Sequence, residues 1–177
     1  MGTKTRTIAN NLSRGLAVPG YTQATAVSAS GQGASITFTG IPSGTNSIIM
    51  TCQNMTTDSS AGVDFATRIG DSGGIETSGY SSIDNFRGVS AGDMGSHTDT
   101  SYFRHAYGFS ATDVWTGNLF YNRISGNYWV CTYTAHDITE YTRWGAGHKE
   151  LSGELTQIQC LWNVGSFDGG SVNIQYA

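Results

Sequence analysis

Several residues of this 177-residue chain have the types and spacing that catalysis can use. Ser72 lies in the run Gly70-Asp71-Ser72-Gly73-Gly74, and Thr134-Ala135-His136 follows further along the chain. A serine nucleophile needs a histidine within hydrogen-bond reach and a carboxylate that orients the histidine. These two segments are therefore the first candidates for an active site. The alternative is a glycine-rich turn in which Asp71 and Ser72 hydrogen-bond to the backbone.

The order of the residues argues against a protease. The run 70–74 resembles the nucleophile loop of trypsin-like serine proteases, and 134–136 resembles the segment around their catalytic histidine. That family places its histidine well before its serine, whereas His136 follows Ser72. The chain is also shorter than a two-barrel protease. We therefore expect a turn at 70–74 and no catalytic residue.

The histidines give little support for a metal site. None lies at metal-ligand spacing from another histidine or from a cysteine; they are His97, His105, His136 and His148. His97 with Asp99, or His136 with Asp137, could each supply two ligands, and the alternative is a solvated loop. We predict no metal and no cofactor.

Two pairs of carboxylates are close in sequence, Asp137 with Glu140 and Glu150 with Glu154. A glycosidase needs two carboxylates at a set separation across a cleft, which proximity in sequence does not establish. We expect these residues to be solvated loop charges.

The three cysteines, Cys52, Cys131 and Cys160, form no CxxC pair, and their number is odd. Each lies in a strand-like run, so we expect buried free thiols. Free thiols suit folding in a reducing cytosol. The N-terminus lacks the apolar region of a signal peptide. No apolar run approaches the ~20 residues of a membrane span, so we expect no membrane partner.

Aromatic residues crowd the second half of the chain, and most should fill a core. Tyr141 and Trp144 differ because they lie in the polar stretch 138–150, which we predict to be a loop. Exposed rings there could stack on a sugar or anchor a protein interface. We therefore name Tyr141 and Trp144 as candidate binding residues.

Charge is distributed unevenly along the chain. No acidic residue precedes Asp58, while Lys4, Arg6 and Arg14 give residues 1–57 a net charge of +3. The remainder holds six basic and thirteen acidic residues, a net charge of −7. A nucleic-acid binder needs a larger basic footprint. The pattern favours a basic arm that docks on an acidic surface, either of a partner or of another copy.

The elements that must position these residues are strands. Charged residues make up only 12% of the chain, and glycine is abundant (24). Short alternating runs are separated by Gly-rich turns, without helical periodicity. We predict strands at 22–29, 34–39, 46–53, 62–69, 75–80, 101–110, 116–124, 127–135, 153–163 and 171–176, and a long surface loop at 84–100. The pattern predicts an all-β, antiparallel, jelly-roll-like β-sandwich over residues 21–177, preceded by an extended N-terminal arm over residues 1–20.

Three segments of this sequence resemble a domain that recurs in structural proteins of tailed phages, especially cyanobacterial and marine phages. The segments are Phe38-Thr39-Gly40-Ile41-Pro42-Ser43-Gly44, the run 69–80 (IGDSGGIETSGY) and the run 167–174 (FDGGSVNI). The resemblance covers about residues 34–177, and Gly169 stands where the family has alanine. It implies a jelly-roll-like virion protein without catalysis, in which the loop around Ser72 is only a turn.

This resemblance leaves the place in the virion open. The short chain and its basic arm favour a capsid cement (decoration) protein, assembled in the host cytoplasm. Such a protein would form homotrimers that clamp neighbouring major capsid subunits. Lys4, Arg6 and Arg14 would contact the capsid or neighbouring subunits, and segment 84–100 would contribute to trimer or shell contacts. The alternative is a tail-fibre or tail-tip domain that binds a host glycan through Tyr141 and Trp144. An enzyme is the third hypothesis.

Overall fold

The computed structural model describes residues 20–90, 92–137 and 141–177, and in these ranges it contains strands and no helix. Lys4, Arg6 and Arg14 lie outside the described residues. The strands are β1 (Thr22–Gln23), β2 (Val27–Ser28), β3 (Ser35–Thr39), β4 (Ser47–Thr57), β5 (Val63–Asp71), β6 (Gly74–Ile75), β7 (Tyr80–Gly88), β8 (Met94–Asp99), β9 (Phe103–Phe109), β10 (Trp115–Ser125), β11 (Tyr128–Asp137), β12 (Tyr141–Glu150), β13 (Gln157–Trp162) and β14 (Phe167–Tyr176).

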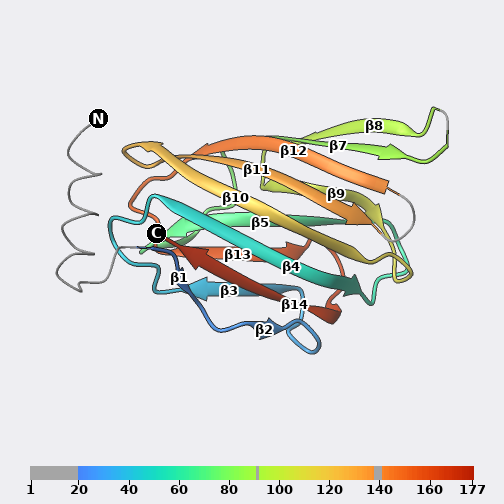
Figure 1. Cartoon of the computed structure of the whole chain (residues 1–177), viewed down its shortest axis with the longest axis horizontal. Helices are drawn as coiled ribbons and strands as arrows, with labels where there is room; N and C mark the ends of the chain where they lie inside the picture. Colours follow the sequence, from blue (N-terminus) through green and yellow to red (C-terminus); the bar gives the residue numbers. More distant parts are fainter. Residues whose placement is uncertain (1–19, 91, 138–140) are drawn as a thin grey trace, which may run out of the picture.

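The strands form two antiparallel sheets that pack face to face (Figure 1). The large sheet has the order β1-β14-β4-β10-β11-β12-β7-β8, and β2 also pairs with β14. The small sheet has the order β3-β13-β5-β6, and β9 also pairs with β5. The predicted all-β, antiparallel sandwich is confirmed.

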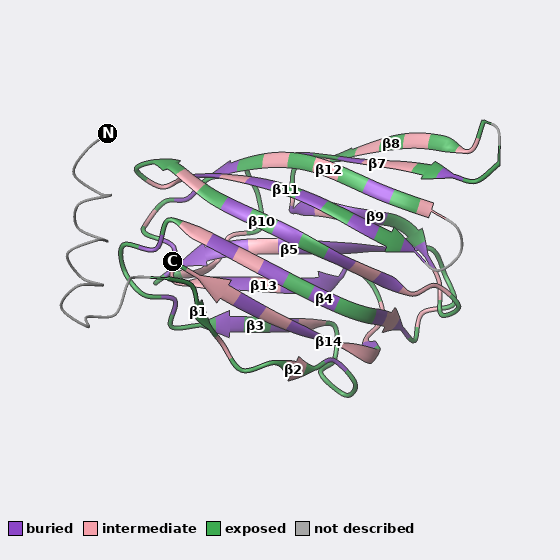
Figure 2. Cartoon of the chain, in the orientation of Figure 1, coloured by how far each residue is buried: buried purple, intermediate pink, exposed green. Residues whose placement is uncertain are grey.

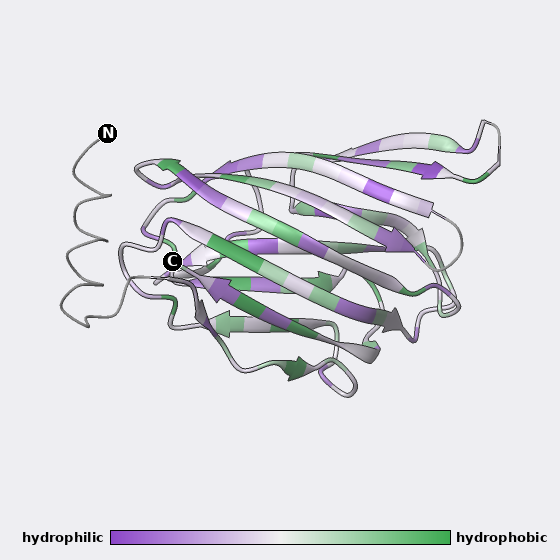
Figure 3. Ribbon diagram, in the orientation of Figure 1, coloured by the Kyte–Doolittle hydropathy of each residue, from purple (hydrophilic) through white to green (hydrophobic). Residues whose placement is uncertain are grey.

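Alternating side chains explain why these segments pair as strands. Ile36 and Phe38 point into the core from β3, and Trp129, Cys131 and Tyr133 do so from β11. Figure 2 shows the same alternation of buried and exposed bands along β4, β10 and β11, and Figure 3 shows bands of opposite hydropathy along β4. All three cysteines are buried and free, as expected.

The predicted surface loop at 84–100 is wrong. This segment contains the end of β7 and all of β8, which pair from Ser82↔Asp99 to Arg87↔Met94. Most of its inward-facing positions carry polar residues, among them Asp84 on β7 and His97 and Asp99 on β8. The usual hydrophobic alternation of a strand is therefore missing from the sequence.

The predicted polar loop at 138–150 is also wrong over its described part. Residues Tyr141–Glu150 form β12, which pairs with β11 on one side and β7 on the other. Arg143 and Lys149 are its inward-facing, buried charges. Because charged residues occupy these inward positions, the sequence lacks the apolar alternation that would predict a strand. A smaller difference occurs in the hairpin between β10 and β11, whose turn is Gly126-Asn127 rather than Ser125-Gly126.

Candidate functional site

The glycine-rich run 70–74 forms the tight connection between β5 and β6. The Asp71 carboxylate accepts hydrogen bonds from the Gly73 amide (2.7 Å) and the Ser152 hydroxyl (2.8 Å). These bonds lower the pKa of Asp71, with the Ser152 bond the largest cause. Tyr80 ties the following segment back, because its hydroxyl donates to Glu76 O (2.9 Å) and accepts from the Ile69 amide (3.0 Å). This run therefore has the architecture of a turn.

The residues of the hypothetical triad lie apart. Ser72 is exposed at the tip of the small sheet, whereas His136 lies on β11 of the large sheet and faces solvent. His136 pairs across the strands with Thr116 and Thr142. The fold therefore does not bring Ser72 and His136 together.

The other candidate pairs are also separated or occupied. Across the ranges that the structure describes, no group of three His, Cys, Asp or Glu side chains could hold a metal ion. His136 and Asp137 point to opposite faces of β11. Glu154 accepts hydrogen bonds from Gly44 N (2.7 Å) and Ser43 Oγ (2.8 Å), which lower its pKa. Glu140 lies outside the described residues.

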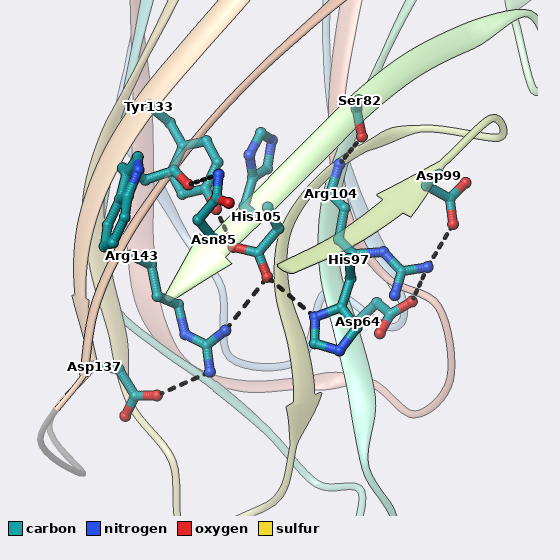
Figure 4. A network of polar contacts seen from close by, with 12 residues as sticks. Asp64, Ser82, Asn85, His97, Asp99, Arg104, His105, Tyr133, Asp137 and Arg143 are labelled. Carbon is teal, nitrogen blue, oxygen red and sulfur yellow. Dashed lines mark hydrogen bonds and ion pairs between the residues drawn. The ribbon is translucent and has the colours of Figure 1, made fainter. Parts of the chain in front are cut away.

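A buried polar network, which the sequence did not predict, joins the two sheets where β7, β8 and β12 cover β9 (Figure 4). Asp84 is its centre and is fully buried. Tyr133 donates a hydrogen bond to Asp84, Arg143 Nη1 lies 3.5 Å away, and His97 Nδ1 lies 4.0 Å away. Burial raises the pKa of Asp84, while Tyr133 and Arg143 oppose that shift.

A second group of charges continues the network toward β5. Arg104 on β9 contacts Asp99 and lies 3.2 Å from Asp64, which accepts a 2.6 Å hydrogen bond from the Tyr102 hydroxyl. Burial by itself would raise the pKa of Asp99, but the Arg104 bond and the Ser101 amide lower it overall. Charge pairing thus replaces apolar packing in this part of the sandwich interior.

The network opens into a cavity of about 320 Å³, here named the β9–β12 pocket. Arg143 lies against three aromatic rings, with its guanidinium carbon 4.9 Å from the Phe109 centroid, 5.4 Å from Phe86 and 5.8 Å from Tyr141. Arg143 Nε has no hydrogen-bond partner among the described residues. Asp113, Asp137, His97, Tyr107 and Gly108 complete the lining.

The solvent-facing side of the large sheet, here named the outer face, has few charged residues. Its two central rows run across seven and eight strands without a charged side chain. The first row is Ser96, Asn85, Trp144, Thr134, Asn118, Thr51 and Asn173; the second is Thr98, Ile83, Ala146, Thr132, Phe120, Ile49, Gln175 and Gln23.

The two aromatic candidates lie on opposite faces of β12. Trp144 is 44% exposed on the outer face, beside a depression that Asn85, Met94 and Ser96 also line. Tyr141 points inward, contacts Phe86 edge to face (5.6 Å between centroids) and lines the β9–β12 pocket. The two rings therefore do not form one stacking platform.

Neither a protein-family model nor a curated protein matches this sequence. The described residues include no helix long and apolar enough to cross a membrane.

Proposed function

We propose that this chain is a non-enzymatic structural protein of a bacteriophage virion, a capsid cement protein that clamps neighbouring major capsid subunits as a homotrimer. The observation that supports this function is the absence of charged side chains from the two central rows of the outer face. The resemblance of the segments 38–44, 69–80 and 167–174 to tailed-phage structural domains is the reason for proposing this class of particle.

The outer face differs in its charge from an ordinary exposed protein surface. A soluble domain normally intersperses charges of both signs over about 25–35% of its surface. Depletion of Lys, Glu and Asp is instead typical of the core of a protein interface. The outer face offers Thr, Asn, Ser and Gln for hydrogen bonds and Trp144, Phe120 and Ile83 as exposed apolar contacts. Such a face suits contact with a protein shell.

A charge placed in the centre of this face tests the proposal. Thr134→Lys puts an ammonium in the middle of the first row, where a contacting shell would bury it without a partner. Its matched control, Thr39→Lys, adds the same charge to an exposed position on the small sheet. We expect occupancy on purified capsids to fall at least tenfold for Thr134→Lys and to stay unchanged for Thr39→Lys. Equal, undiminished occupancy for both variants would rule out the outer face as the contact.

Two further measurements address the virion and the arm. Counting this chain per major capsid protein should give hundreds of copies per particle for a cement protein, and a few or a few tens for a tail protein.

Deleting residues 2–18 should lower capsid occupancy through the loss of Lys4, Arg6 and Arg14. Unchanged occupancy would remove the arm from the proposal.

The exposed ring of Trp144 favours a second candidate function, a tail-fibre or tail-tip domain that binds a host glycan. Asn85, Ser96 and Thr134 surround that ring with uncharged hydrogen-bonding groups, an arrangement that suits a neutral sugar. Glycan-array binding that is lost in Trp144→Ala but kept in Phe120→Ala would support this candidate. No binding by the wild-type chain would rule it out.

A further inference from the structure

The β9–β12 pocket is acidic. Asp113 and Asp137 line it, Asp84 lies beneath it, and Arg143 is the single lysine or arginine in its lining. Arg143 already lies 3.5 Å from both Asp84 and Asp137. The neighbouring Arg104 is likewise shared between two acids, Asp64 and Asp99. This end of the sandwich therefore carries an excess of negative charge.

Aromatic rings form the walls of the same pocket. Tyr107 is 51% exposed and stacks on His97 with 4.0 Å between ring centroids. His97 also stacks on Phe86, with 5.9 Å between ring centroids, and the guanidinium carbon of Arg143 lies 5.4 Å from the Phe86 centroid and 5.8 Å from the Tyr141 centroid. A cation over an aromatic face is attracted by the negative charge of the ring face. Acidic groups combined with such rings select a cation with an apolar stem, which describes an arginine or lysine side chain.

The chain itself contains a segment of the required chemistry. Residues 1–19 include Lys4, Arg6 and Arg14 and no acidic residue. A peptide also brings backbone carbonyls, which a metal ion lacks. Such a carbonyl could accept a hydrogen bond from Arg143 Nε, which finds no acceptor within the described part of the chain. Charge complementarity therefore favours this segment over a bare cation.

The position of β1 points to a neighbouring copy as the source of the segment. The described chain enters the fold at β1, on one edge of the large sheet, while β8 is the opposite edge strand. In Figure 1, β1 lies at the left, whereas the end of β11 and the start of β12 lie at the right. A chain that enters the fold at one end of the molecule and a pocket at the other end suit head-to-tail contacts, which close into a ring when the rotation between copies allows it.

We propose that a basic side chain of the N-terminal segment of one copy occupies the β9–β12 pocket of the next copy. This inference rests on the proposed homotrimer and adds the contact that builds it. Arm and pocket then form a heterologous interface, repeated once per subunit.

Two complementary variants of the full chain test the contact. The arm variant, Lys4→Glu/Arg6→Glu/Arg14→Glu, keeps the pocket, and the pocket variant, Asp113→Asn/Tyr107→Leu, keeps the arm. Asparagine at position 113 can still accept the Ser110 amide bond that shapes the turn. Glu150→Gln is the control, because it removes one acidic charge from the outward side of the same sheet.

Sedimentation velocity should show that wild type and Glu150→Gln form the same oligomer. The arm and pocket variants should each self-associate at least tenfold more weakly. Mixing these two variants should produce a dimer, since the mixture restores one intact arm and one intact pocket. Near-UV circular dichroism checks that each variant keeps the fold. The single variant Asp113→Asn should also weaken self-association, as the double pocket variant does.

A monomeric wild type, or a mixture that forms no dimer, would overturn the inference. The first result would also remove the homotrimer from the proposed function, while the capsid measurements would still test whether the outer face binds the shell. The second result, with wild type still oligomeric, would place the subunit contact elsewhere. Neither result depends on whether Thr134→Lys lowers capsid occupancy.

Discussion

His105 lies between the two sheets, and its Nε2 lies 2.7 Å from the Thr67 hydroxyl. The Thr67 hydroxyl in turn lies 2.6 Å from the Tyr121 hydroxyl. Burial lowers the pKa of His105 to about 3. The unfolded chain protonates this histidine below pH ~6.5. Between those two values the unfolded state binds the extra proton, so stability falls as the pH falls, by up to about 1.4 kcal/mol per pH unit.

The variant His105→Gln should remove this part of the pH dependence, because glutamine can bond Thr67 but does not titrate. Urea unfolding at pH 7, 6, 5 and 4 should give a shallower loss of stability for His105→Gln than for wild type. His148→Gln, at an exposed position on the outer face, is the control and should follow wild type. Parallel curves for wild type and His105→Gln would contradict the prediction.

Tyr80 and Ser72 test whether the run 69–80 is structural. The Tyr80 hydroxyl bonds both backbone groups of Ile69 and the carbonyl of Glu76. Tyr80→Phe removes these bonds, although the Ile69 carbonyl keeps the bond from the Glu76 amide, and it should lower the free energy of unfolding by about 1–3 kcal/mol. Ser72→Ala, at an exposed turn position, should change it by less than about 0.5 kcal/mol. Chemical denaturation measures both, and a large effect of Ser72→Ala would assign that hydroxyl a role the turn does not explain.

At the scale of elements, β12 depends on close contact with both of its neighbours. Gly145 has no side chain, and a Cβ there would overlap the Ile83 carbonyl of β7 and the Tyr133 ring of β11. Gly145→Ala should therefore cost about 1–3 kcal/mol of stability by overpacking. Ala146→Ser, on the outward side of the same strand, should be neutral. Thermal unfolding compares the two, and equal melting temperatures would show that β12 can shift freely.

β12 and the end of β7 could not be predicted as strands from the sequence. The strands β3, β10 and β11 could be predicted because apolar residues occupy their inward positions. In β7 and β12 those positions hold Asp84, Arg143 and Lys149, so hydropathy alone predicted loops. Only the pairing of β12 with β7 brings Arg143 to Asp84 and creates the β9–β12 pocket. Tyr141 and Trp144 could be named as candidates because they are aromatic residues in a polar stretch. Their side chains point in opposite directions because the segment is a strand and not a loop.

At the scale of the whole molecule, the two sheets enclose all three thiols. Burial raises the pKa of Cys160 to about 12 and also raises the pKa of Cys52 and Cys131. A thiol reagent at pH 8 should therefore label none of them until the sandwich opens, and labelling should follow the rate of global unfolding. An added cysteine in Thr39→Cys should react at once. Fast labelling of a native cysteine would reveal local opening of the core.

The position of β14 in the large sheet has a consequence for synthesis of the chain. Among the described residues, β1 and β2 pair only with β14. One edge of β4 also pairs with β14, as in the pair Thr51↔Asn173. On the ribosome, Ile48 and Met50 therefore have no β14 beside them until the last strand has left the exit tunnel. Contacts this distant in sequence make folding slow. The large sheet should consequently be completed only once β14 has left the ribosome, and until then the nascent chain should need chaperone protection.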